Sequence, residues 1–285
     1  GITAPEGFRW LDTPDELVMQ RAVNLLAALG ATEDDGSLTD VGRRMTAFPL
    51  PPRLARLIVA GQDEQCVVEL AAIAALMQGE GVAMKGGLND NLRDSADYTD
   101  FQAEWRAVEK AAAAGFDAGA CTRWGVSARG AREVWMAYRQ LLSIGSRGKF
   151  REVPEPDFTA ARPAVVRAMM ESFADHVGVR NGVAANTCRI TGGVGGRLAE
   201  GSVVFHGEHF VAAEVAELSG KAVETRVGRC TLIDPEELRA VWPERFSGGE
   251  EAVFDAVLRR VRLHRRLMYE NLVLEDRDRG DAPPE

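Results

Sequence analysis

The chain has 285 residues, of which 46% are hydrophobic, and carries a formal net charge of −9. This length is ample for a hydrophobic core and for more than one domain. The acidic balance argues against a chain that binds nucleic acid over its whole surface, because phosphate binding depends on cationic side chains. There is no apolar run of eighteen residues and no signal-peptide pattern at the start, so the sequence predicts a folded cytoplasmic protein.

The first fifty residues predict a linker and a winged-helix-like unit, residues 1–50. Thr13 precedes Pro14 and stands three residues before Glu16, which is a capping-box pattern for a helix that ends near Gly30. Thr39 is expected to cap a second, short helix after the acidic turn "TEDDGSL".

Residues 51–152 are expected to form a helical bundle. The stretch "PLPP" ends the first unit, and a new helix begins at Arg53, because proline is tolerated only in the first turn of a helix. Hydrophobic periodicity and glycine positions predict further helices near 63–78, 98–114 and 127–144, with a weak one within 84–94.

Residues 153–247 predict one more helix, over 165–177, followed by a small antiparallel barrel. The hydrophobic period falls to two in "TCRIT", "SVVFH", "HFVAAEVAEL" and "KAVETRVGRCTLI", which indicates strands. Residues 248–285 are expected to form a basic hairpin and a disordered, polar end. The predicted fold class is therefore α+β and multidomain, with a winged-helix-like unit, a helical bundle and a barrel.

Motifs for catalysis, nucleotide binding and metal binding are absent or incomplete. "SIGSRGKF" lacks the first glycine and the final Ser or Thr of a phosphate loop, and "GGVGG" lies between strands rather than before a helix. His206 and His209 lie in a loop without helical spacing, and the four cysteines are far apart, so no metal site is expected. We assign no catalytic, cofactor-binding or metal-binding residue.

Binding is the remaining function, because the charge is unevenly spread. Residues 121–151 contain seven basic residues and one acid, and Arg123, Arg129 and Arg132 alternate there with Trp124 and Trp135. Cations interleaved with aromatic rings are typical of a surface that follows a single nucleic-acid strand, although Trp135 and Tyr138 also fit a core position. "RRVRLHRR" over 259–266 is a second basic patch, which fits either RNA or an intramolecular partner for nearby acids.

The stretch "ALGATEDDGSLTDVGRRMTAFPLPPRLARLIV" resembles the junction between the winged-helix and ratchet (HA2) domains of DEAH-type RNA helicases. "DYTDFQAEW" and "CTRWGVSARGAREVWMAYRQLL" resemble later ratchet helices, although Tyr138 stands where that family usually has arginine. "TLIDPEELRAVWPERF" resembles the end of the OB-fold that follows, and the tail is most similar to the bacterial HrpB-type branch.

This resemblance implies an accessory region that holds single-stranded RNA against RecA-like motor domains. Those domains, with ATP and magnesium, are expected before residue 1, so this chain alone is expected to be inactive. The residues expected to bind RNA, chosen from charge and position, are Arg123, Arg129, Arg132, Arg180, Arg189 and Arg197, of which the family pattern supports Arg129 only. The alternatives are a protein-interaction module that docks the motor or an activator, and a stand-alone winged-helix DNA binder, which the acidic first unit disfavours.

Overall fold

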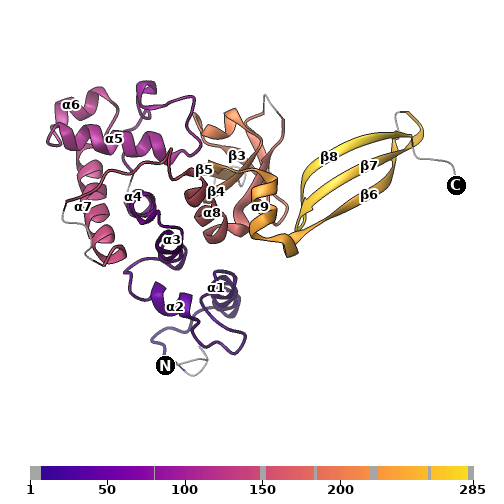
Figure 1. Ribbon diagram of the computed structural model, residues 1–285, viewed down its shortest axis with the longest axis horizontal. Coiled ribbons are helices and arrows are strands. Elements are labelled where there is room, and N and C mark those ends of the chain that lie inside the picture. Colours follow the sequence, from indigo (N-terminus) through magenta and orange to yellow (C-terminus); the bar gives the residue numbers. More distant parts are fainter. Residues whose placement is uncertain are drawn as a thin grey trace. The chain divides into compact units, whose positions relative to one another are not determined.

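The computed structural model describes residues 8–79, 81–147, 152–182, 185–218, 224–255 and 258–281. Figure 1 shows helices in the first part of the chain and strands in the second. The chain forms two compact units, of which the first consists of Gly1–Leu92 and Glu104–Ser172 and the second of Arg93–Ala103 and Phe173–Glu285. This division is coarser than the four predicted segments, whose borders stay predictions. No helix in the described ranges has the length and apolar character needed to cross a bilayer.

The first unit begins with two helices joined by a turn, as predicted. They are α1 (Glu16–Ala28) and α2 (Asp40–Met45), and a single β-bridge links Thr32 to Leu38 between them. The predicted cap of α1 was wrong: the Asp15 carboxylate, rather than Thr13, accepts hydrogen bonds from the backbone at positions 17 and 18. A carboxylate at this position also interacts favourably with the helix dipole.

The end of α1 and the start of α2 are held together closely around Thr39. Its Oγ1 accepts from the Gly42 N–H at 2.9 Å and donates to the Gly30 carbonyl at 2.6 Å, so the predicted cap of α2 is confirmed. Gly30 has φ +67°, which favours glycine after a helix. A Cβ on Gly42 would lie 2.0 Å from the Ala31 carbonyl oxygen, so only glycine allows this approach.

The rest of the first unit is a helical bundle, and it contains most of the predicted helices. The short helix α6 was not predicted, and the weak helix within 84–94 is reduced to a 3-10 turn, η2 (Asp90–Leu92). The helices are α3 (Pro52–Asp63), α4 (Val67–Gln78), α5 (Phe101–Ala113), α6 (Ala118–Arg123), α7 (Ala128–Gly145) and α8 (Arg162–Ser172). Residues 70–76 of α4 are fully buried, which makes this helix the centre of the bundle.

Arg56 joins three segments of the first unit at the predicted domain junction. Its Nε donates to the Leu29 carbonyl at the end of α1, at 3.2 Å, and its Nη2 lies 2.8 Å from the Glu171 carboxylate on α8. Both side chains of this ion pair are largely buried. Arg53 of the same helix donates to the Ser172 carbonyl, at 3.1 Å. The arginines of the motif "PPRLARL" therefore hold the unit together.

The second unit contains a closed barrel of five strands with the order β1-β2-β3-β5-β4. Its strands are β1 (Val177–Arg180), β2 (Thr187–Ile190), β3 (Val194–Leu198), β4 (His209–Leu218) and β5 (Glu224–Leu232). The expected barrel is confirmed, but β3 and β5 run parallel, so it is not wholly antiparallel. Val177 begins strand β1 instead of ending the predicted helix, after the 3-10 turn η3 (Ala174–His176). "SVVFH" forms the 3-10 helix η4 (Val203–His206), not a strand.

A segment from earlier in the chain, residues 93–103, is hydrogen-bonded to the barrel. Asp100 is the centre of this contact: one carboxylate oxygen accepts from the Val203 N–H at 2.7 Å, and the other accepts from Cys230 N–H and the Ser202 hydroxyl. Next to it, the hydroxyls of Thr99 and Thr231 lie 2.9 Å apart. Burial raises the pKa of the Asp100 carboxyl, because the charged form loses contact with water.

The C-terminal part of the second unit is a three-stranded antiparallel sheet, β6-β7-β8 (Figure 1). It follows α9 (Pro235–Val241) and η5 (Pro243–Arg245), and its strands are β6 (Phe246–Asp255), β7 (Arg260–Tyr269) and β8 (Leu272–Asp281). The predicted hairpin thus gains a third strand. The expected disorder of the polar end was wrong as far as Asp281, and residues 282–285 lie outside the described ranges.

We expect Asp100→Ala to lower the free energy of unfolding by about 3 kcal/mol, because three donors lose a carboxylate acceptor. Urea unfolding followed by circular dichroism measures this. Asp94→Ala is the control, because the exposed Asp94 carboxylate caps only the nearby Ala96 N–H. Equal losses in the two variants would contradict the central role of Asp100.

Candidate nucleic-acid interface

Three of the six predicted RNA-binding residues lie on the last two helices before residue 147. Arg123 ends α6, while Arg129 and Arg132 lie in the first two turns of α7, and all three are exposed. The Nε of Arg129 lies 2.8 Å from the Glu133 carboxylate one turn later, an exposed pair of little energetic value. Arg132 lies over the ring of Phe116, 5.2 Å from its centre. Cationic side chains therefore do gather here, with part of their charge already compensated.

The aromatic side chains of this region are mostly core residues. Trp105, Trp135 and Tyr138 pack against each other, with ring centres 4.7–6.1 Å apart. Tyr138 is fully buried and its hydroxyl donates to the Pro154 carbonyl at 2.7 Å, which accounts for a tyrosine where the helicase pattern has arginine. Of the two rings expected to alternate with cations, only Trp124 remains as a separate group, with Lys110 Nζ 5.6 Å from its centre.

Arginines from three neighbouring strands share the outer face of the barrel. Arg197 on β3 is the register partner of Arg226 on β5, and Arg189 on β2 is opposite Gly195, two residues from Arg197. The adjacent residues in each strand, including Cys188, Leu198 and Val227, point into the core. All three arginines are exposed. Arg226 was not predicted, because its position next to Arg197 follows from the parallel pairing of strands distant in sequence.

The charge of this face is reduced at one position only. Arg197 Nε lies 2.5 Å from the Glu224 carboxylate, and both side chains are about half exposed. Arg189 and Arg226 have no ion pair in the described part of the chain. Because exposed pairs are weak and exchange with other anions, this face can offer up to three guanidinium groups to phosphates.

Arg180, predicted to bind RNA, is a structural residue of the barrel. Its side chain is 8% exposed, and its guanidinium donates to the carbonyls of Ala185, at 3.0 Å, and Val204, at 3.2 Å. The same group lies over the ring of Phe205. With its donors directed at the protein, Arg180 is not on the surface with Arg189 and Arg197, and we leave it out of the interface.

Comparisons with known proteins agree with this architecture. Residues 22–50 match the family described as "Helicase associated domain (HA2), winged-helix". Over 76 residues the chain is 38% identical to the mouse protein named "ATP-dependent RNA helicase homolog DQX1", of which these residues are 11%. Two crystal structures of Escherichia coli HrpB, one titled a DExH-box NTPase and one a DEAH/RHA helicase, align with 99% and 100% of the chain, at TM-scores of 0.62 and 0.61 and identities of 21% and 19%.

The predicted resemblance to the C-terminal region of a DEAH-box helicase is confirmed. The chain spans about three tenths of the HrpB chains with which it aligns and a ninth or so of the curated relative. The HA2 match covers the second half of α1, the turn that follows it and α2.

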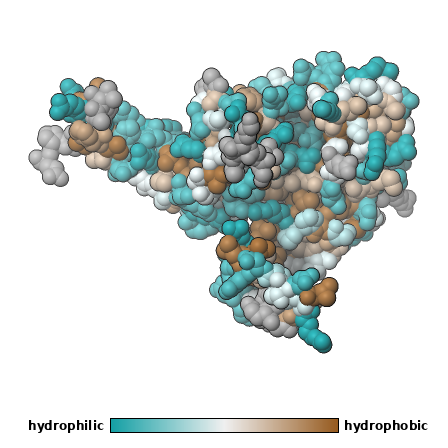
Figure 2. Space-filling view, turned by 180° about the vertical axis from the view of Figure 1, so that it is seen from behind, coloured by the Kyte–Doolittle hydropathy of each residue, from teal (hydrophilic) through white to brown (hydrophobic). Residues whose placement is uncertain are grey.

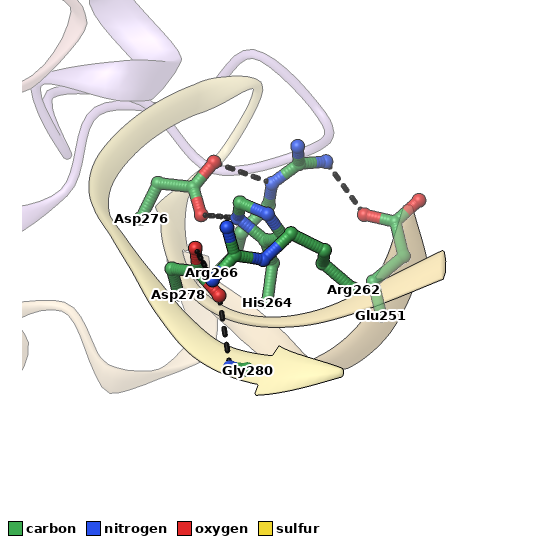
Figure 3. A network of polar contacts seen from close by, with 7 residues as sticks. All are labelled: Glu251, Arg262, His264, Arg266, Asp276, Asp278 and Gly280. Atoms are coloured by element: carbon green, nitrogen blue, oxygen red, sulfur yellow. Dashed lines mark hydrogen bonds and ion pairs between the residues drawn. The ribbon is translucent and has the colours of Figure 1, made fainter. Parts of the chain in front are cut away.

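The second basic patch, over 259–266, is largely neutralised by acids of its own sheet. Arg262, His264 and Arg266 project from one face of β7 toward acids of β6 and β8, as Figure 3 shows. Arg266 pairs with Glu251 at 2.6 Å and with Asp276 at 3.0 Å. Of the two alternatives for this patch, RNA or nearby acids of the chain, these three residues therefore have the acids as partners. Hydrogen bonds from His264 and Arg266 lower the pKa of Asp276, which keeps this carboxylate charged. We call this set of pairs the ion-pair ladder; its members are Glu251, Arg262, His264, Arg266, Asp276 and Asp278.

Other sequence features do not form a site in the described residues. The described ranges contain no group of three or more potential metal ligands. His209 Nε2 donates to the Leu274 carbonyl at 2.9 Å, which is a structural contact. The four cysteines are buried and unpaired. Lys149 and Arg151 of the first basic patch, and the end of "SIGSRGKF", lie outside the described residues.

The contrast between Arg180 and Arg189 predicts different effects on stability. We expect Arg180→Met to lower the free energy of unfolding by about 2 kcal/mol, because the carbonyls of Ala185 and Val204 each lose a charged donor. Arg189→Met, on the exposed face, is expected to change it by less than about 0.5 kcal/mol. Urea unfolding of both variants measures the difference. An unchanged free energy of unfolding in Arg180→Met would contradict the structural role of Arg180.

Proposed function

We propose that this chain is the nucleic-acid-binding accessory region of an ATP-dependent DEAH-type RNA helicase, and that it holds single-stranded RNA against RecA-like motor domains. The HA2 match and the likeness to HrpB support the first part. ATP and Mg²⁺ belong to the motor domains in this proposal, and no residue of this chain is assigned to hydrolysis.

The observation that carries the RNA-binding part is the arginine face of the barrel. We assign the barrel to the OB-fold class, which its closed Greek-key order β1-β2-β3-β5-β4 supports. In that class the face of strands 2 and 3 binds oligonucleotides. Arg189 and Arg197 lie on these two strands here, and Arg226 extends the row to β5. A row of guanidinium groups suits successive phosphates of one strand.

The helix arginines form a second proposed RNA-binding surface, on the first unit. Arg123, Arg129 and Arg132 lie on exposed turns of α6 and α7. Because the aromatic rings beside them are largely packed in the core, we assign these arginines to phosphate contacts without base stacking. This makes binding dependent on salt and insensitive to base sequence.

We expect Arg189→Gln with Arg226→Gln to weaken binding of a labelled single-stranded RNA roughly tenfold at low salt, because two phosphate contacts are lost. The slope of log K against log salt should fall by roughly 1.4. Fluorescence anisotropy measures both quantities. The control is Arg259→Gln with Arg279→Gln, which makes the same charge change on exposed residues of strand β8 and of the turn before β7.

Equal losses in both double variants would mean that only net charge matters, and would contradict the barrel assignment. RNA binding by the wild type that persists when duplex DNA is added as competitor is expected, because the proposed surfaces take one strand.

A second contact, with protein, is favoured by the exposed apolar side of α1. Leu17 and Val18, neighbours on the apolar side of this helix, are exposed, and no residue within the bounds of α1 is buried. Figure 2 shows hydrophobic side chains at the surface of the winged-helix part. We assign this side to the motor domains, since an amphipathic helix requires an apolar partner. An activator protein that uses the same surface is the alternative.

We expect Leu17→Asp with Val18→Asp to abolish co-elution with separately expressed motor domains in size-exclusion chromatography, because charge would enter an apolar contact. The chain itself should stay folded, as both side chains are exposed. Gln20→Asp, on another side of α1, is the control. Unchanged co-elution would exclude α1 from the contact.

A further inference from the structure

The C-terminal sheet has a second face, which the ion-pair ladder does not neutralise. Arg265 lies between His264 and Arg266 in β7, so its side chain is on the opposite face of the sheet. Its register partner on β8 is Arg277, which lies on that same face. Residues directly opposite each other in a sheet have Cβ atoms ~5 Å apart, and like charges at this distance repel.

The acids nearby compensate this pair incompletely. Arg277 Nη2 lies 2.8 Å from the Glu275 carboxylate on its own strand. Glu250 is opposite Arg265 on β6, but the two form no ion pair in the described part of the chain. Arg265 therefore keeps an unpaired guanidinium beside a second arginine. On the ladder face, by contrast, Arg266 is held by two acids at once.

The two arginines open into a cavity between the sheet and α9. Its volume is about 390 Å³, within the usual range of ligand pockets. Arg239 of α9 lines it from another element and has no ion pair in the described residues. Phe246 and Leu267 supply apolar wall, while Glu236 and Glu275 are its acids. Arg239, Arg265 and Arg277, from α9, β7 and β8, thus line one cavity. Arg266 also lines it, but its guanidinium is held by Glu251 and Asp276.

We propose that this cavity is a phosphate-binding site, which receives a phosphate of single-stranded RNA beyond the barrel. Arginine presents its donors in a planar fork that matches phosphate oxygens, and a bound phosphate offsets the repulsion between Arg265 and Arg277. The assignment of this phosphate to RNA rests on the proposed function, in which the barrel holds an RNA strand. A free phosphate is the other source of the same chemistry.

The first arm of the test measures RNA. Arg265→Gln with Arg277→Gln is expected to weaken binding of a labelled single-stranded RNA roughly fivefold and to lower the salt slope by roughly 0.7, the value for one phosphate on a single strand. Arg259→Gln with Arg279→Gln is the matched control, because it removes the same charge from exposed residues that do not line the cavity. Equal effects in the two variants would overturn the proposal.

The second arm uses inorganic phosphate and pyrophosphate, with NMR of the arginine Nε–H groups as the readout. Shifts at Arg265, Arg277 and Arg239, absent in the Gln variant, are expected. If these ions bind but RNA affinity does not change in the variant, the site takes free phosphate and its assignment to RNA is wrong. If wild-type chain binds no RNA at all, the proposed function fails, while the phosphate shifts still decide the cavity. Absence of shifts together with unchanged RNA binding would overturn the site alone.

Discussion

The carboxylate of Asp100 is the contact on which the barrel depends, because it connects three segments that are far apart in the sequence. It accepts from η4, from β5 and from Ser202, while its own segment, residues 93–103, precedes the barrel by seventy residues or more. Strand β5 in turn pairs with β3 in parallel, and this pairing brings Arg226 beside Arg197. The proposed phosphate-binding face thus depends on the strand that the Asp100 carboxylate holds in place.

Arg56 has the corresponding role in the first unit, and this changes how the family pattern is interpreted. The stretch "PPRLARL" belongs to the junction that carries the most specific resemblance, but Arg53 and Arg56 point to the carbonyls and the carboxylate of their own unit. Gly42 and Thr39, also in that pattern, hold α1 close to α2. The junction pattern therefore reflects contacts that build the unit, and the arginines proposed to bind RNA lie outside this junction.

Local signals predicted the elements that local interactions form. Helices with a side-chain cap, such as α2 and α7, could be placed within a few residues, and so could α4, which has no such cap but a continuous run of buried apolar residues. The failures have a tertiary cause: Val203 and Val204 read as strand, yet Ser202 donates to Asp100 and turns the chain into η4. Helix α6 has only six residues and contains Gly119, too short for a periodic pattern. The second half of the third strand of the C-terminal sheet is mostly charged, and Asp276 and Asp278 have their partners on β7. These pairings between strands cannot be read from the local pattern.

The cations posed a different problem, because sequence shows charge but not its partner. Arg180 and Arg189 stand in adjacent strands of similar composition, yet one guanidinium is bonded to buried carbonyls and the other is exposed. Asp276 and Glu251 likewise neutralise Arg266, while Arg265, one residue away, has neither. A net charge of −9 is thus compatible with an anion-binding protein, since many acids are engaged in the ladder and in similar pairs. The proposals therefore depend on arginines that strand register places side by side, Arg197 with Arg226 and Arg265 with Arg277, where an acid among the described residues pairs with only one member of each pair. Register is a property of the fold.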